Sequence, residues 1–221
     1  DILERLVRRE RPFDPLFLRA VYEFSAESHR EQTRQSGEPF LVHPLQVAYL
    51  LADWKFDPVS VAAGLLHDVL EDTLTTKETL EERFGHDVAE LVDGVTKIGR
   101  HAYVRKDQVQ AETFRKMILA SAKDLRVILV KLADRYHNLQ TLEHLPTDTR
   151  RRIAQETLEI YAPIAQRLGM NNIRIEFEDL GFTALHPMRA RRIHAAVRKA
   201  RGNRKELVTQ IQRKIEARLR E

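Results

Sequence analysis

The spacing of apolar residues limits the fold of this chain more than any other sequence feature. These residues recur at the three- and four-residue intervals that place side chains on one face of a helix. Only 8 glycines and 8 prolines interrupt them among 221 residues. The run from Leu125 to Ala133 has an apolar middle, which indicates a buried central helix. The sequence therefore predicts an all-α fold.

Prolines and short polar segments mark where several helices begin. Asp14-Pro15 and Asp57-Pro58 each place a proline in the first turn of a helix, and Val42-His43-Pro44 does so after a polar loop. Further helices are expected over residues 77–84, 86–98, 111–122, 124–134, 149–165 and 167–182, with breaks at Pro163 and Gly169.

Composition narrows the class of protein. With 43% hydrophobic and 32% charged residues, the chain suits one soluble domain with a real core. It has no apolar run of membrane-spanning length and no secretory signal pattern, so a cytoplasmic location is expected. The absence of cysteine excludes disulfides and thiolate metal ligands. A net charge of +4 mildly favours anionic partners but does not establish nucleic-acid binding.

The stretch from His67 to Asp72 gathers one imidazole and three carboxylates directly after an apolar run. On a continuous helix, His67 would lie over Glu71, and Asp68 over Asp72. Carboxylates held this close repel one another unless a cation compensates them, and imidazole with carboxylate suits manganese, iron or zinc. We therefore predict a divalent metal site; the alternative is a solvated acidic helix end with a stray histidine.

Two other positions carry polar groups that need an explanation. His43 stands at a helix start beside a loop, where, taken singly, it fits a surface or capping role better than a metal ligand. Asp134, Asn138 and Thr141 form a single polar stripe on an otherwise buried helix, one turn after Lys131. Buried polar groups need partners, so the stripe either bonds to neighbouring helices or lines a cavity. The pattern favours the cavity.

Taken together, these residues resemble a known family. The order His43, His67-Asp68, Asp134 on an all-α chain is similar to the HD superfamily of metal-dependent phosphohydrolases. The segments 37–44, 67–73, 95–97, 131–141 and 161–169 resemble, in order, the hydrolase domain of the Rel/SpoT homologues, which make and degrade the alarmones ppGpp and pppGpp. The resemblance implies an HD-type helical bundle over residues 1–182 and a basic helical extension over 183–221.

The resemblance also implies an activity and a site. Water would remove the 3′-pyrophosphate of (p)ppGpp, giving GDP or GTP and pyrophosphate, with manganese as cofactor. A metal can lower the pKa of bound water from about 15.7 toward 7 and neutralise charge on phosphoryl oxygens. By motif match, the ion would be held by His43, His67, Asp68 and Asp134, and the attacking water would be oriented and deprotonated by Glu71 and Asp72. The guanosine would be surrounded by Arg34, which stacks on the base, and by Ser36, Lys131, Asn138 and Thr141.

The chain departs from the family pattern at two places. Phe40 replaces a tyrosine that many relatives have, and Leu139-Gln140-Thr141 replaces Met-Arg-Thr, which removes one positive charge near the site. Neither change affects the predicted ligands, and the complete HD set favours a competent hydrolase. Thr96-Lys97 falls near the same site without an assigned role.

The ends of the chain and one internal loop complete the expectations. Residues 8–11 form a basic arm, residues 99–107 a polar loop, and the extension two amphipathic helices interrupted at Gly202-Asn203. Solvated helix faces explain the basic charge of the extension; an RNA or partner contact is the alternative. The missing initiator Met and the basic tail indicate the N-terminal part of a long bifunctional enzyme, with a synthetase domain in cis, rather than a small stand-alone hydrolase.

Two rival functions remain open at this point. One is an HD phosphohydrolase that acts on another nucleotide, such as a deoxynucleotide. The other is a non-catalytic module that binds alarmone and signals to a partner.

Overall fold

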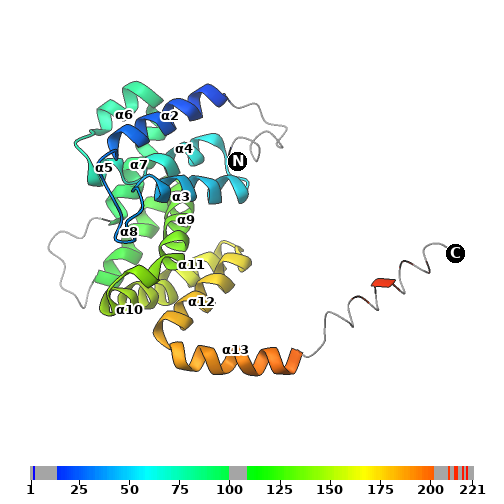
Figure 1. Ribbon diagram of the computed structural model, residues 1–221. Coiled ribbons are helices and arrows are strands. Elements are labelled where there is room, and N and C mark those ends of the chain that lie inside the picture. Colours follow the sequence, from blue (N-terminus) through cyan, green and yellow to red (C-terminus); the bar gives the residue numbers. More distant parts are fainter. Residues whose placement is uncertain are drawn as a thin grey trace.

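The computed structural model describes residues 14–99 and 109–201, together with Ile2 and five isolated positions beyond residue 208. Within them the chain contains no strand, so the all-α prediction is confirmed (Figure 1). The helices are α2 Pro15–Ser28, α3 Val42–Asp53, α4 Pro58–Leu66, α5 Val69–Asp72, α6 Lys77–Phe84, α7 His86–Gly99, α8 Val109–Lys123, α9 Arg126–Gln140, α10 Thr147–Glu156, α11 Ala162–Arg167, α12 Asn171–Leu185 and α13 Pro187–Arg201.

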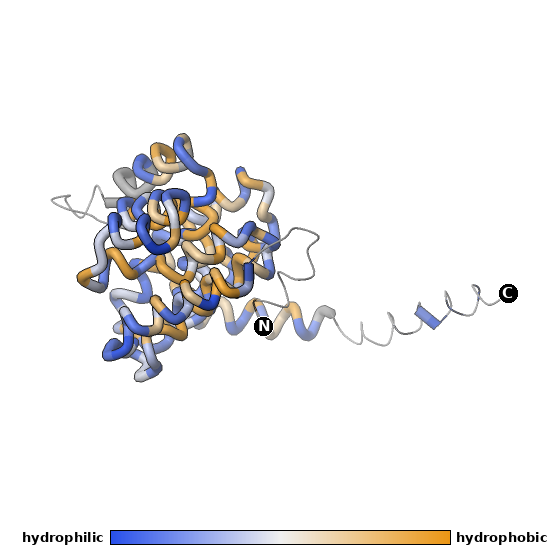
Figure 2. The backbone as a smooth tube through the Cα atoms, turned by 90° about the horizontal axis from the view of Figure 1, so that it is seen from above, coloured by the Kyte–Doolittle hydropathy of each residue, from blue (hydrophilic) through white to orange (hydrophobic). Residues whose placement is uncertain are grey.

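Helix α9 lies at the centre of the molecule, as its apolar run predicts. In Figure 1 it runs between a group formed by α2 to α7 and a second group formed by α10 to α12. It packs against α3, α4, α7, α8 and α12. Val130, Leu132 and Ala133 of α9 are fully buried in the hydrophobic core. Figure 2 shows apolar and polar positions alternating along the helices, in keeping with their amphipathic spacing.

Helices α3 and α4 form an antiparallel pair that decides where the histidines lie. A short connection over residues 54–57 joins them. Gly64 lets the two helices approach closely, because a Cβ there would lie 2.7 Å from Leu51 Cδ1 and 3.3 Å from Ala48 Cα. The start of α3, which carries His43, consequently lies beside the end of α4, which precedes His67.

The stretch from His67 to Asp72 is not one continuous helix, so that part of the sequence prediction is wrong. Helix α4 ends at Leu66, His67 and Asp68 form a turn, and α5 begins at Val69. The Asp68 carbonyl accepts hydrogen bonds from the backbone N–H groups of Glu71 (3.0 Å) and Asp72 (2.9 Å). The chain therefore bends at the His67-Asp68 pair, which frees both side chains from a common helix face.

The predicted break at Pro163 is also wrong. The chain stays helical from Thr147 to Arg167 through a π-helical turn at Thr157–Tyr161, and Pro163 lies in the first turn of α11. Pro163 follows directly on the π-helical turn, where the regular α-helical hydrogen-bond ladder is already shifted, so the proline does not interrupt the segment. Gly169 does end this segment, with a φ of 73° that favours glycine.

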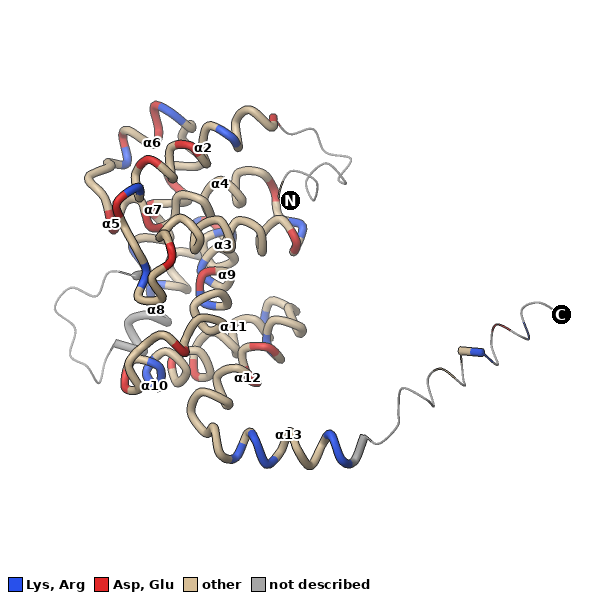
Figure 3. Tube along the Cα trace, viewed as in Figure 1, with Lys and Arg blue, Asp and Glu red and all other residues tan. Residues whose placement is uncertain are grey.

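Helix α13 leads away from the bundle (Figure 1). It carries only Lys and Arg among its charged residues (Figure 3). The predicted domain boundary at residue 182 falls within α12. The basic arm at residues 8–11, most of the 99–107 loop and the break at Gly202-Asn203 lie outside the described residues. Among the described residues, no helix combines the length and the apolar character needed to cross a membrane.

Candidate metal centre

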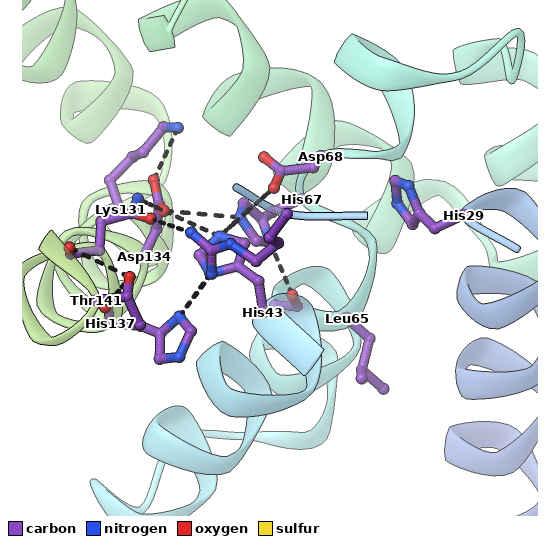
Figure 4. A network of polar contacts seen from close by, with 12 residues as sticks. His29, His43, Leu65, His67, Asp68, Lys131, Asp134, His137 and Thr141 are labelled. Atoms are coloured by element: carbon purple, nitrogen blue, oxygen red, sulfur yellow. Dashed lines mark hydrogen bonds and ion pairs between the residues drawn. The ribbon is translucent and has the colours of Figure 1, made fainter. Parts of the chain in front are cut away.

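His67 is fully buried in the turn after α4. Its Nδ1 lies 2.9 Å from the carbonyl oxygen of Gly64, which can only accept, so Nδ1 is the donor. In the neutral ring, Nε2 then carries the lone pair. That Nε2 lies 3.2 Å from Nε2 of His43. Figure 4 shows the two side chains close together.

His43 lies in the first turn of α3 and is buried, so its interpretation as a surface or capping residue is wrong. Its Nε2 lies 3.3 Å from Asp134 Oδ1 and 3.5 Å from Asp68 Oδ2. Its Nδ1 lies 2.7 Å from Nδ1 of His137. Burial lowers the pKa of His43, which keeps the ring neutral.

The two carboxylates close the cluster. Asp68 Oδ2 lies 3.1 Å from His67 Nε2, and Asp134 Oδ1 lies 3.9 Å from the same nitrogen. Donor atoms of His43, His67 and Asp134 all lie within 4.8 Å of one another. The structure thus brings together the four side chains that the sequence motif singles out, although they come from three separate parts of the chain.

Charge in this cluster is balanced between buried groups. Burial lowers the pKa of His67, but the carboxylates of Asp68 and Asp134 outweigh it and raise this pKa to about 9. Burial raises the pKa of Asp68, but His67 outweighs it and lowers this pKa to about 2. Burial likewise raises the pKa of Asp134, and Lys131 reverses the effect and holds it well below its usual range. The two carboxylates therefore attract positive charge toward the imidazole of His67.

This donor set fits a divalent transition ion. Two imidazole nitrogens and two carboxylate oxygens are ligands that manganese, iron and zinc accept. Both imidazoles turn Nε2 toward the other ligands, and two bare Nε2 atoms 3.2 Å apart repel unless positive charge lies between them. Either a proton or a metal ion can supply that charge.

Glu71 and Asp72 follow the cluster on α5 and are exposed to solvent. Partial desolvation nevertheless raises the pKa of each carboxyl group, and Lys131 opposes this effect at Glu71. Gln32 Nε2 donates to the backbone carbonyl of Asp72 at 2.8 Å, which ties this turn to the loop after α2. Exposed carboxylates with raised pKa values are suited to accept a proton.

The predicted substrate residues divide into two groups. Lys131 Nζ lies 3.2 Å from Asp134 Oδ2, Asn138 Nδ2 donates to Asp134 Oδ1 at 2.6 Å, and Arg34 Nη2 donates to Asn138 Oδ1 at 3.0 Å. These three residues surround the cluster. Ser36 Oγ instead donates to Glu38 Oε2 within its own loop, and Thr141 Oγ1, just after the end of α9, donates to the carbonyl of His137 in that helix.

Two buried histidines at this site have no role in the sequence prediction. His137 contacts both His43 and Arg34. The available signal was its position three residues after Asp134 on a buried helix, which places the two on one face. His29 stacks on Phe40 with ring centroids 4.6 Å apart, and its Nδ1 lies 2.7 Å from Gln32 Oε1. Neither residue interrupts the apolar periodicity, so spacing alone does not single them out.

A groove of about 620 Å³ lies elsewhere, between α7, α8 and the start of α9. Lys97 lines it and pairs with Asp93 at 2.5 Å, whereas the neighbouring Thr96 is buried. None of the predicted ligand or substrate residues lines this groove.

Comparison with known proteins identifies the family. A family model described as an HD domain matches residues 21–171, which include the whole cluster. The chain belongs to the HD-domain family. This HD domain is 51% identical over 220 residues to the bifunctional (p)ppGpp synthase/hydrolase SpoT of Escherichia coli K12, covering 99% of the chain and 31% of SpoT.

Other curated relatives show the same partial coverage. The guanosine-3′,5′-bis(diphosphate) 3′-pyrophosphohydrolase of Aquifex aeolicus is 46% identical over 204 residues, covering 90% of this HD domain chain and 29% of that protein. A Myxococcus xanthus protein named GTP pyrophosphokinase is 50% identical over 194 residues, covering 86% and 26% respectively. The chain therefore spans less than a third of the length of these relatives.

A solved structure supports the fold. It is described as a metazoan orthologue of SpoT that hydrolyses ppGpp, and it shares 26% sequence identity with a TM-score of 0.56. The match covers 77% of this chain and 96% of that one. The resemblance to the Rel/SpoT homologues is thereby confirmed.

Proposed function

We propose that this HD domain removes the 3′-pyrophosphate of (p)ppGpp by hydrolysis, with manganese as cofactor. The observation that carries the proposal is the convergence of His43, His67, Asp68 and Asp134. It occurs in a chain that is about half identical to proteins named guanosine-3′,5′-bis(diphosphate) 3′-pyrophosphohydrolase. In the whole protein, we expect a synthetase domain to accompany it, as the name of SpoT indicates for that relative.

These four side chains would hold the ion through the two Nε2 atoms and one oxygen from each aspartate. When bound, manganese would supply a Lewis acid that stabilises negative charge on phosphoryl oxygens and favours ionisation of water. The protein's own contribution is to fix the ligands. The hydrogen bond from His67 Nδ1 to the Gly64 carbonyl and the salt bridge from Lys131 to Asp134 hold two of them in place.

Glu71 and Asp72 would orient the attacking water and take its proton. The water oxygen attacks the phosphorus bonded to the ribose 3′ oxygen, that P–O bond breaks, and the 3′ oxygen leaves and is protonated. The products are GDP or GTP and pyrophosphate. The raised pKa of Glu71 supports its role, because a base that binds protons more tightly gives a larger driving force for proton transfer.

The substrate would lie against the cationic side of the cluster. Lys131 and Arg34 supply positive charge toward the pyrophosphate and guanosine, and Asn138 lies beside both Arg34 and Asp134. Arg34 would stack on the base, and Ser36 and Thr141 would contact the nucleoside.

Product identification in the presence of Mn²⁺ tests the proposal. The purified chain is incubated with ppGpp, pppGpp, dGTP and nucleoside monophosphates, and the products are separated by ion-exchange chromatography. Release of pyrophosphate with GDP or GTP supports the proposal. Preferential turnover of dGTP would assign a different nucleotide substrate, and binding of ppGpp without turnover in metal-replete protein would indicate a regulatory module.

A further inference from the structure

His137 lies where the candidate metal site meets the candidate substrate site. It is buried on α9, and its Nδ1 lies 2.7 Å from His43 Nδ1 and 3.2 Å from Arg34 Nη1. Its ring meets that of His43 edge to edge through the two Nδ1 atoms, with centroids 5.0 Å apart and 30° between the planes. Figure 4 shows His137 on the side of His43 that faces away from His67.

The partners of His137 decide the direction of these hydrogen bonds. A guanidinium group can only donate, so Nδ1 of His137 is the acceptor in its contact with Arg34. An unprotonated Nδ1 on His137 requires Nδ1 of His43 to donate across the 2.7 Å contact. In neutral His43 the remaining nitrogen, Nε2, then carries the lone pair, and Nε2 is the atom that faces Asp134 and His67.

A closed ring of contacts joins Arg34 to two candidate ligands. On one side, Arg34 contacts His137, which contacts His43. On the other side, Arg34 donates to Asn138, which donates to Asp134 Oδ1 at 2.6 Å. The 3.3 Å contact between His43 Nε2 and Asp134 Oδ1 closes the ring. The residue proposed to hold the base is therefore coupled to both ligands through single intermediate side chains.

We propose that His137 is a positioning residue. The single lone pair of its Nδ1 accepts chiefly from Nδ1 of His43 and is shared with the more distant Arg34, which fixes the tautomer and orientation of the His43 ligand. The inference rests on the manganese site of the proposed function. Partners of this kind raise metal affinity by holding a ligand in its binding geometry, and their loss costs about 10- to 100-fold in affinity or activity.

Two substitutions separate hydrogen bonding from ring packing. His137→Asn places an amide oxygen close to the position of Nδ1 and loses the ring. His137→Phe keeps a ring that packs beside His43 but has no acceptor. Binding of Mn²⁺ alone to wild type and to each variant is measured from the electron paramagnetic resonance signal of the free ion, and a thermal unfolding curve shows that each variant is folded.

We expect His137→Phe to weaken Mn²⁺ binding about 10- to 100-fold and His137→Asn to stay within about 3-fold of wild type. With ppGpp as substrate, the kcat of the Phe variant should fall at limiting Mn²⁺ and recover in excess Mn²⁺. The opposite order, with Phe close to wild type and Asn weakened, would show that packing alone matters and overturn the proposal. If Phe fails to fold, His137→Leu takes its place with the same expected loss.

The outcomes also distinguish this inference from the proposed function. Equal Mn²⁺ affinity in wild type and His137→Phe would reject the positioning role and leave the hydrolase proposal intact. Wild-type protein that does not bind Mn²⁺ would reject both.

Discussion

Asp68 is the residue whose loss should affect the cluster most directly. Its Oδ2 lies within 3.5 Å of the Nε2 atoms of both His43 and His67. Asp68→Ala removes an oxygen ligand and half of the negative charge that attracts a cation. We expect Mn²⁺ binding and turnover to be lost together, as measured by the free-ion resonance signal and by release of pyrophosphate. Asp87 is an exposed carboxylate on α7, so Asp87→Ala is the matched control and should behave as wild type.

Substitution of Glu71 should lower the rate of hydrolysis without changing the affinity for Mn²⁺. Glu71 lies outside the four-residue cluster, and its side chain is exposed to solvent. Glu71→Gln keeps the size of the side chain but removes the base, so kcat should fall by about 10²–10⁴ while Mn²⁺ affinity stays unchanged. Glu78→Gln on α6 controls for the loss of an exposed acid. Turnover of Glu71→Gln at the wild-type rate would remove Glu71 from the mechanism.

Among the helices, α9 depends on an ion pair at its start that makes stability depend on pH. Asp124 Oδ1 accepts from the backbone N–H of Arg126 at 2.8 Å, and the Arg126 side chain reaches both Asp124 and Asp57. Hydrogen bonds from the Arg126 side chain hold the pKa of Asp124 below its usual value of 3.8. A lowered pKa stabilises the fold at pH values above 3.8, and this stabilisation is lost as the pH falls through the lower, folded-state pKa.

Asp124→Asn isolates this contribution, because the amide oxygen can still accept from the backbone of Arg126. We expect the variant to be less stable than wild type by up to about 1 kcal/mol at pH 7, since the pair is partly exposed. The difference should be constant down to about pH 4.5 and shrink below pH 3.8, as measured by urea unfolding across this range. A difference that does not change with pH would contradict the electrostatic explanation.

The opposite face of α9 is tied to α10 and the π-helical turn by a second ion pair. Arg135 Nη2 donates to Glu156 Oε2 and to the hydroxyl oxygen of Tyr161, each at 3.0 Å, and its guanidinium lies over the Tyr161 ring. Both charged side chains are less than 15% exposed. Arg135→Leu would leave the Glu156 charge buried and unpaired, which costs about 3–5 kcal/mol.

The double variant Arg135→Leu/Glu156→Leu tests this explanation. Removing both charges should recover most of the lost free energy of unfolding, because no unpaired charge remains. Guanidinium unfolding of the wild type, both single variants and the double variant gives the coupling. Additive losses would show that the two residues act independently.

At the scale of elements, the sequence predicts what is local and misses what is tertiary. Asp14-Pro15 and Asp57-Pro58 start helices α2 and α4 as predicted, because caps and proline geometry act within a few residues. The bend at His67-Asp68 carries no such signal, because the residues around it continue a helical spacing. The contact between His43 and His67 depends on the close approach of α3 and α4 at Gly64. The spacing of residues within one helix does not predict how closely two helices pack. The candidate ligand set follows from the family resemblance, whereas the contacts of His137 depend on how α9 packs against α3.

At the scale of the whole molecule, α12 and α13 relate differently to the bundle. Helix α12 packs against α9, α10 and α11, and its Phe177 is fully buried. Helix α13 contacts α12 mainly and points away from the bundle (Figure 1). The predicted boundary at residue 182 therefore lies close to a change in packing, although it falls three residues before α12 ends.

Two truncations test where the folding unit ends. A chain ending at His186 keeps α12 and should lose less than about 1 kcal/mol of stability, with Mn²⁺ affinity unchanged. The reason is that α13 packs mainly against α12 and carries none of the cluster residues. A chain ending at Gly169 lacks Phe177, whose removal from a core alone costs about 3–5 kcal/mol, and should show no cooperative thermal transition. Circular dichroism melting and the free-ion Mn²⁺ signal measure both. If the chain ending at His186 also failed to fold, α13 would belong to the HD domain rather than to a separate extension, because its loss would then remove part of the same cooperative unit.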